Sequence, residues 1–243
     1  MDIGWNMASY MGVRAARELE VVSHNLANAS TLGFKRELLN NWQLNSPQSS
    51  LSGEPEAAQY VDVRSHDFGQ GSIHETYKDT DLALQGPGFF KIQTPQGIRY
   101  TRNGNFRLDP DKQLVTQEGY PVMGKNGPIT LDSLDKNYAF DAEGGVHLDK
   151  NLGDQILVAD FANPQDLRPW GQTLLAAGPQ AGPEQEAPTT RIIQGNIEES
   201  NVDLVSESVN LVDIQRRYEA YLKVLDTFTN KDQKVVDEIG QQA

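Results

Sequence analysis

The residues that could do chemistry in this chain are few, and they do not converge on a catalytic pattern. The sequence has no cysteine, which excludes thiolate catalysis and disulfides. Its four histidines do not stand at the spacing of a metal-binding pair on a helix or in a zinc finger. His66 and His74 are followed by carboxylates as far as Asp81. A hydrolase that uses the range 66–81 is therefore one alternative, although the pattern favours solvated loop residues.

One segment is similar to a phosphate-binding loop. Residues 119–126 read Gly-Tyr-Pro-Val-Met-Gly-Lys-Asn, whereas such a loop needs Ser or Thr after the lysine and a helix behind it. Asn126 is instead followed by Gly127, Pro128 and a strand-like run. The serines also lack the strand-to-helix setting of a nucleophile. We therefore predict no catalytic, cofactor-binding or metal-binding residues, and no enzymatic activity.

Composition limits the class of partner. The formal net charge is -13 among 243 residues, which argues against nucleic acid and against anionic membrane surfaces. A hydrophobic fraction of 37%, with 21 Gly and 12 Pro, favours a soluble, elongated molecule with many turns. Asp2 stands where a secretory signal would carry Lys or Arg, and no long apolar run follows it. The sequence thus predicts neither a cleavable signal peptide nor membrane insertion.

Both ends of the chain have the period of amphipathic helices that need a partner. Apolar or small residues recur at spacings of three and four, which places them on one helical stripe. The N-terminal stripe comprises Trp5, Ala8, Gly12, Ala15, Leu19, Val22 and Leu26. The C-terminal stripe comprises Leu211, Ile214, Tyr218, Tyr221, Leu225, Phe228, Val235 and Ile239. The repeat resembles the heptads of a coiled coil.

A second, offset stripe on the C-terminal helix cannot be covered by the same partner. It comprises Val202, Val205, Val209 and Val212. One interpretation is a two-helix hairpin packed on its own β domain. The other is a hairpin that packs laterally against neighbouring subunits, with all of these stripe residues forming the assembly interface.

The middle of the chain predicts a β domain between two connectors. Short apolar runs punctuated by glycine are typical of strands, and Asn103-Gly104, Asn126-Gly127 and Gly144-Gly145 predict hairpin turns. The resulting fold class is α+β, with a discontinuous N- and C-terminal helical coiled-coil domain and a central all-β domain. The expected segments are an N-terminal helical segment (1–35), an extended connector (36–80), the β domain (81–175), a Pro/Gly-rich return connector (176–199) and a C-terminal helix (200–243) that begins with a capping box at 200–203.

The segment 23–36 closely resembles the N-terminal signature of the bacterial flagellar rod and hook proteins. The matching residues are Asn25, Leu26, Ala27, Asn28, Thr31, Gly33, Phe34 and Lys35. Further stretches that look like family landmarks are 86–90, 100–106, 113–122 and 195–202. Within the family, the short length, the segment 127–130 and the compact linker look most like a proximal rod protein, and the distal rod protein is the nearest alternative.

The resemblance implies a structural subunit of the flagellar rod. Terminal helices of many copies would form an inner tube, β domains an outer layer, and the rod would transmit torque across the periplasm. Its implied partners are copies of itself, other rod proteins, the flagellar type III export apparatus and the surrounding basal-body rings. We also expect that charging Leu225 or Ile214 abolishes assembly. A monomeric β binding module with a helical stalk is the alternative from another functional class.

Overall fold

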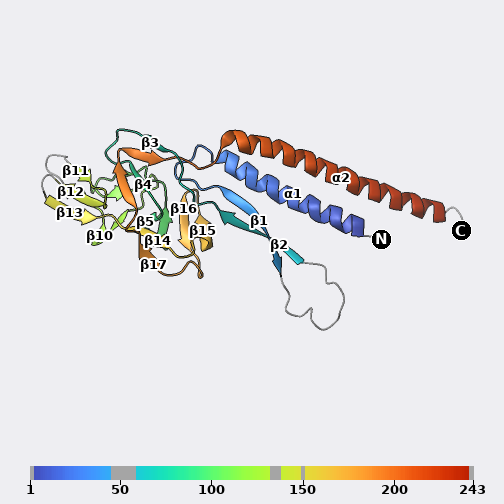
Figure 1. The fold of residues 1–243 in the computed structure, drawn as a ribbon, viewed down its shortest axis with the longest axis horizontal. Coiled ribbons are helices and arrows are strands. Elements are labelled where there is room, and N and C mark those ends of the chain that lie inside the picture. Colours follow the sequence, from blue (N-terminus) through green and yellow to red (C-terminus); the bar gives the residue numbers. More distant parts are fainter. Residues whose placement is uncertain (1–2, 45–58, 132–137, 149–150, 241–243) are drawn as a thin grey trace. The chain divides into compact units, whose positions relative to one another are not determined.

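The computed structural model describes residues 3–44, 59–131, 138–148 and 151–240. The chain divides into two compact units. The helical unit contains Met1–Ala27, Glu37–Ser65 and Asp203–Ala243, and the β unit contains Asn28–Arg36 and His66–Val202. The fold class is α+β, with a helix at each end and mostly strands between (Figure 1). Sequence position alone therefore does not separate the units, because the chain passes between them repeatedly.

The helical unit is built on two antiparallel helices, α1 (Ile3–Ala27) and α2 (Leu204–Gly240), which run side by side in Figure 1. Their shared core consists of Ala15, Val22 and Ile214, with Leu19, Leu211, Tyr218 and Tyr221 packed at its margin. The strands β1 (Glu37–Leu44) and β2 (Gln59–His66) pair with each other, and β1 packs on α1. Neither described helix combines the length and the apolar character that a membrane-spanning segment needs.

The predicted N-terminal helix is confirmed, whereas α2 begins later than the sequence suggested. Asp203 Oδ1 accepts hydrogen bonds from the backbone N–H groups of Val205 and Ser206, both at 2.9 Å. Asp203 is therefore the N-cap residue, and the capping box expected from Ser200 is wrong. The Ser200 hydroxyl oxygen instead accepts from the Val202 N–H at 3.2 Å in the turn before the helix. With 37 residues, α2 is about 55 Å long.

The β unit holds a six-stranded antiparallel sheet in the order β15-β16-β6-β5-β14-β17. A three-stranded sheet, β11-β12-β13, and the pairs β18-β4, β19-β3, β7-β8 and β10-β9 accompany it. The strands are β3 (Ile73–Glu75), β4 (Leu82–Gln85), β5 (Phe89–Thr94), β6 (Gly97–Thr101), β7 (Arg107–Leu108), β8 (Leu114–Val115), β9 (Met123–Gly124), β10 (Gly127–Pro128), β11 (Tyr138–Phe140), β12 (Gly145–Leu148), β13 (Asn151–Gln155), β14 (Val158–Phe161), β15 (Leu167–Trp170), β16 (Leu174–Ala177), β17 (Glu184–Glu186), β18 (Arg191–Gln194) and β19 (Asn196–Glu198), with a 3-10 turn at Pro164–Asp166.

Two hydrophobic cores stabilise this unit, and β5 contributes to both. Successive side chains of a strand point to opposite faces. Phe90 and Ile92 accordingly join the larger core, while Phe89 joins a smaller one with Tyr100 and Phe161. The apolar run at 89–92 is thus a strand buried on both faces. This arrangement makes the β unit a rigid support for the polar cluster described below.

The three predicted hairpins have different outcomes. The Gly144-Gly145 hairpin is confirmed, since β11 pairs with β12 with Phe140 opposite Val146. A hairpin also forms near Asn126, but Gly124 pairs with Gly127, so that the turn residues are 125–126. Asn103-Gly104 does not join two paired strands, because β6 pairs with β5 and β16, and β7 pairs with β8. A Cβ atom on Gly104 would overlap the Leu82 carbonyl oxygen, so this glycine permits a close backbone approach.

Both segments predicted as connectors contain strands. The range 36–80 includes β1, β2 and β3, and the range 176–199 includes the end of β16 together with β17, β18 and β19. Each of β17, β18 and β19 pairs with a strand distant in sequence. The proline and glycine residues between these short strands form turns. This explains why the composition of 176–199 suggested a connector without strands.

Candidate assembly surface

The structure divides the predicted interface residues into an internal seam and an external surface. On α1, Ala8, Gly12, Ala15 and Val22 are buried, Leu19 and Leu26 are half-buried, and Trp5 is exposed. On α2, Ile214 is buried, and Leu211, Tyr218, Tyr221, Leu225 and Phe228 are half-buried. The side chains of Val235 and Ile239 lie outside the described residues. Most of the two long stripes therefore pack within one chain.

Small residues on α1 allow α2 to approach closely. A Cβ atom on Gly12 would lie 3.8 Å from Tyr221 Cβ, and one on Gly4 would lie 3.2 Å from Phe228 Cζ. Ion pairs border the seam, since Glu18 lies 3.1 Å from Arg14 and 3.0 Å from Arg217. These contacts also fix the register of the antiparallel pair, in which the start of α1 lies beside residue 228 of α2.

The second stripe is the part of the prediction that faces outward. Val205 and Val209 retain 73% and 57% of their accessible surface, and Val212 is also exposed. Val202 is buried and lies in the β unit, one residue before the N-cap. Three valines within two turns of an exposed helix face are costly for an isolated molecule, because apolar area in water disfavours that state.

The motif residues at the end of α1 include one that ties two backbone segments together. Asn25 is buried; its Nδ2 donates to the Glu37 carbonyl oxygen at 2.9 Å, and its Oδ1 accepts from the Glu37 N–H at 2.8 Å. Leu26 and Ala27 complete α1. Through these two bonds, Asn25 at the end of α1 is joined to Glu37, the first residue of β1.

Within the β unit, Gly33 is required by both conformation and space. Its φ angle is +67°, a region that L-residues with side chains rarely adopt. A Cβ atom there would lie 2.5 Å from the Arg102 carbonyl carbon and 2.7 Å from Asn103 Cα. Just before it, the Thr31 N–H donates to the Asn28 carbonyl oxygen at 3.0 Å. A side chain at position 33 would therefore meet both an unfavourable backbone conformation and a steric clash.

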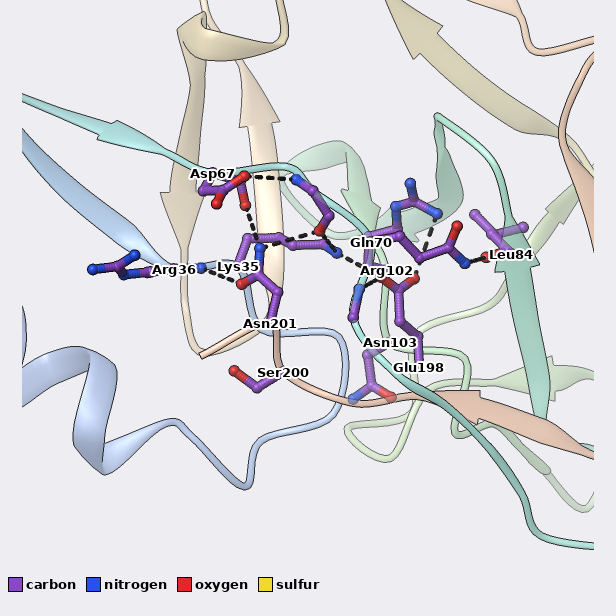
Figure 2. Close-up of polar contacts among 12 residues, drawn as sticks. Lys35, Arg36, Asp67, Gln70, Leu84, Arg102, Asn103, Glu198, Ser200 and Asn201 are labelled. Atoms are coloured by element: carbon purple, nitrogen blue, oxygen red, sulfur yellow. Dashed lines mark hydrogen bonds and ion pairs between the residues drawn. The ribbon is translucent and has the colours of Figure 1, made fainter. Parts of the chain in front are cut away.

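A buried ionic cluster follows directly in the chain (Figure 2). The carboxylate of Glu198, fully buried in β19, accepts from Lys35 Nζ at 2.5 Å and from the Gly71 N–H at 2.9 Å. Its second oxygen lies 3.4 Å from Arg102 Nη1. Lys35 Nζ also donates to the Gly69 carbonyl oxygen at 2.8 Å. One carboxylate thus holds two cations and a backbone N–H from separate segments.

Next to this cluster, the Asn201 side chain forms hydrogen bonds with backbone groups of two other segments (Figure 2). Its Oδ1 accepts from the Arg36 N–H at 2.8 Å, and its Nδ2 donates to the carbonyl oxygens of Asp67 and Gly69 at 2.8 and 3.1 Å. The Asp67 N–H donates in turn to the Arg36 carbonyl oxygen at 2.8 Å. The segments 33–36, 67–71 and 198–201, at which the chain enters or leaves the β unit, are therefore fastened to one another.

Burial governs the electrostatics of the two cations. Desolvation lowers the pKa of Lys35, although the neighbouring Glu198 carboxylate acts in the opposite direction. The pKa of Arg102 is also lowered by burial, against the attraction of Glu198. Arg102 Nη2 additionally donates to the Gly86 carbonyl oxygen at 2.6 Å, and its guanidinium carbon lies 5.5 Å from the centre of the Phe89 ring. Removing Glu198 would leave both buried charges without this compensation.

Sequence reasoning identified Lys35 but missed Glu198, Arg102 and Asn201 as its partners. A signal was available, because Arg102 lies in the landmark 100–106, and the other two lie in the landmark 195–202. Nothing in their spacing, however, indicates that the two landmarks meet residue 35. Phe34, the motif residue before Lys35, is also buried.

The residues that suggested chemistry make separate contacts in the structure. His74 Nε2 lies 3.6 Å from the Glu199 carboxylate on an exposed surface, and buried Asp81 accepts from Asn105 Nδ2 at 3.2 Å. Within the part of the chain that the structure describes, no group of three or more His, Cys, Asp or Glu side chains could hold a metal ion. Lys125 lies in the turn of a hairpin and does not open a helix.

Comparison with known proteins adds the family to this geometry. Residues 83–148 match the family model described as the flagellar hook protein FlgE/F/G D1 domain, and residues 193–238 match the flagellar basal body rod FlgEFG protein C-terminal model. The chain is 35% identical over 231 residues to the flagellar basal-body rod protein FlgF of Caulobacter vibrioides, with 93% of each chain covered. It is 33% identical over 241 residues to FlgG of Buchnera aphidicola subsp. Schizaphis graminum, covering 89% of this chain and 92% of the relative. Its identity to FlgG of Bacillus subtilis is 31% over 245 residues, covering 90% and 92%.

Proposed function

Because the chain belongs to the family of flagellar hook and basal-body rod proteins FlgE, FlgF and FlgG and is a structural subunit of the rod, we propose that it assembles through the outward face of its helical pair and transmits torque. The family is structural and not enzymatic. Its location is the basal body, and it assembles with other rod and hook proteins. The function predicted from the sequence agrees with this family.

The observation that carries the proposal is the exposed apolar face of α2. Val205, Val209 and Val212 face away from α1 and stay accessible, so that a further helix can pack on them in coiled-coil fashion. The seam between α1 and α2 supports this use, because it holds the pair together before neighbours arrive. The hairpin and the lateral interpretations of the stripes are therefore compatible: one stripe closes the hairpin, and the other faces the neighbours.

Torque transmission requires that each subunit deform little under load. In a closed cylinder each subunit is held by several neighbours, and the buried ionic cluster around Glu198 supports stiffness in the β unit, since it fastens three of its segments to one another. We assign the helical unit the assembly contacts and the Lys35 cluster the role of holding the β unit's entry and exit segments in place.

The proposal also covers where along the rod the subunit lies and how it is exported. We favour a proximal, FlgF-like member, because the relative at 35% identity is a FlgF protein, and the distal FlgG-like position is the alternative. The rod would span the periplasm, with the surrounding basal-body rings as neighbours. Export would use the flagellar type III apparatus.

The experiment places a charge on the outward face of α2. Val209→Lys should leave the circular dichroism of the purified chain unchanged, because Val209 is exposed, and should abolish motility and rod formation. Val224→Lys is the matched control, since Val224 is also exposed but lies 15 residues, more than four turns, farther along α2 (224 − 209 = 15). Normal rods with Val209→Lys, or equal loss with Val224→Lys, would contradict the proposed assembly face. A stalked, monomeric binding module would tolerate both changes.

A further inference from the structure

The helical unit carries two separate apolar patches on its outer faces. The α2 patch comprises Val205, Val209 and Val212, and the α1 patch comprises Met7, Tyr10 and Val13, all of them exposed. Tyr10 and Val13 stand five and two residues before Ala15, the seam residue of α1. Val209 and Val212 stand five and two residues before Ile214, the seam residue of α2. At 3.6 residues per turn, both patches therefore point away from the seam.

The α1 patch ends where the small sheet begins. Farther along α1, Arg17 lies 3.0 Å from the Asp62 carboxylate, and Glu20 lies 2.6 Å from Arg64, both on β2. The neighbouring Val21 is buried, and β1 packs on α1. The outer face of α1 is thus covered by its own chain along its second half, whereas Met7, Tyr10 and Val13 stay accessible.

The two patches lie at different heights along the hairpin. Gly4 lies beside Phe228, and Gly12 lies beside Tyr221, which places Tyr10 near residue 222 of α2. Val209 is 13 residues before that level (222 − 209 = 13), so the patches are offset by about 20 Å along the axis. Because they also face in opposite directions, one rigid partner cannot cover both at once.

We infer that the α1 patch of one copy packs on the α2 patch of a second copy, with the copies staggered by about 20 Å along the hairpin axis. The inference rests on the proposed function and names which face meets which. A contact between two different patches is heterologous, so each copy keeps one free patch of each kind for a further neighbour. The contact therefore propagates into a polymer and does not stop at a dimer.

Size and charge support a second copy as the occupant. The α1 patch spans seven residues (7–13) and the α2 patch spans eight (205–212), which correspond to about 9 and 11 Å of helix. Copies related by a screw along the hairpin axis point the same way, so that α1 of one meets α2 of the next antiparallel. This alignment brings the Arg14 end of the α1 patch to the Asp203 end of the α2 patch, which pairs opposite charges.

The absence of native cysteine allows a direct test. Tyr10→Cys and Val209→Cys variants, one enlarged by a tag, are made in the same cells, and isolated basal bodies are treated with a short bismaleimide crosslinker. The expected product is a mixed dimer of the two variants, and the double variant should give a ladder of multimers. Val224→Cys replaces Val209→Cys in the matched control, because Val224 is also exposed, at 43%, but lies 15 residues farther along α2 (224 − 209 = 15) and outside the α2 patch.

The outcomes separate this inference from the proposed function. Crosslinking of Val209→Cys to itself would indicate a symmetric contact and overturn the inference. Equal crosslinking with Val224→Cys, or no mixed dimer in basal bodies of motile cells, would also overturn it, while rod formation in those cells would leave the proposed function intact. Failure of the proposed function would appear instead as normal rods with Val209→Lys.

Discussion

Replacing Glu198 by alanine should destabilise the β unit more than any change to an exposed ion pair. The carboxylate is fully buried and is hydrogen-bonded to Lys35 Nζ at 2.5 Å and to the Gly71 N–H at 2.9 Å. Lys35 and Arg102 are themselves buried. Alanine would leave two buried cations without their counter-charge and the Gly71 N–H group without its acceptor, and water could not reach them freely.

The magnitude follows from what each variant leaves behind. Breaking a buried ion pair by removing one partner costs about 3–5 kcal/mol of unfolding free energy, and we expect Glu198→Ala to fall in that range. Glu198→Gln keeps an acceptor for Lys35 and Gly71 but removes the charge, so it should cost less. Glu184→Ala is the matched control. Its carboxylate lies 2.8 Å from Lys91, with both charged side chains partly exposed, and it also accepts from the Tyr100 hydroxyl at 3.0 Å. Such an ion pair contributes about 0–1 kcal/mol and such a hydrogen bond about 0.5–1.5 kcal/mol, which together stay below the loss expected for Glu198→Ala.

The assay is urea unfolding followed by the fluorescence of Trp170, which lies in β15 of the β unit. Trp5 and Trp42 are replaced by Phe in every variant so that the signal reports this unit alone. The expected order of destabilisation is Glu198→Ala, then Glu198→Gln, then Glu184→Ala. Equal midpoints for Glu198→Ala and Glu184→Ala would refute the reasoning, because the cluster would then contribute no more than a surface pair.

Three further changes test other parts of the structure. Gly33→Ala should lower the unfolding free energy of the β unit by about 2 kcal/mol or more. Gly33→Asn should lower it at least as much, because the Cβ atom itself collides with the Arg102 backbone. A smaller loss for Gly33→Asn than for Gly33→Ala in urea titrations would contradict this. Gly12→Ala should raise the melting temperature of the helical unit, because the methyl group fits 3.8 Å from Tyr221 Cβ and alanine stabilises a helix by about 0.5–1 kcal/mol relative to glycine. A lower melting temperature by circular dichroism would show that the seam has no room for the methyl group. The hydrogen bond from the Ser206 N–H lowers the pKa of Asp203 below 3.8. The cap therefore stabilises α2 fully above pH 3.8, and this stabilisation is lost as the pH falls through the lowered pKa. Asp203→Asn should remove this pH dependence of the helix content, and an unchanged dependence of helix content on pH would contradict the assignment of Asp203 as the cap.

The terminal helices were predictable because their pattern is local. A stripe at spacings of three and four fixes which residues share a face, and Ala15 and Ile214 indeed meet in the seam. The end of a helix depends on finer detail. Ser200 and Asp203 both belong to a plausible capping box, but the carboxylate of Asp203 takes the two free N–H groups, and the helix starts after it.

The β unit was predictable in kind but not in pairing. Strand pairing depends on partners far apart in sequence, as for Ile192 opposite Leu84, and no local rule selects them. The Pro- and Gly-rich range 176–199 therefore resembled a connector although it supplies strands to three different sheets. The same limit applies to Lys35 and Glu198, which are 163 residues apart. A motif can indicate that Lys35 matters without indicating what it binds.

The division between seam and outer face changes which residues can report on assembly. Ile214 is buried between α1 and α2 in a single chain, so a charge there would unfold the hairpin, and lost assembly would not distinguish a broken subunit from a broken contact. Val209 has no such ambiguity, because its exposed side chain can be changed without disturbing the seam. The two apolar stripes of α2 thus have separate roles. One stripe packs against α1 within the subunit, and the other stays exposed to water until a neighbouring subunit covers it.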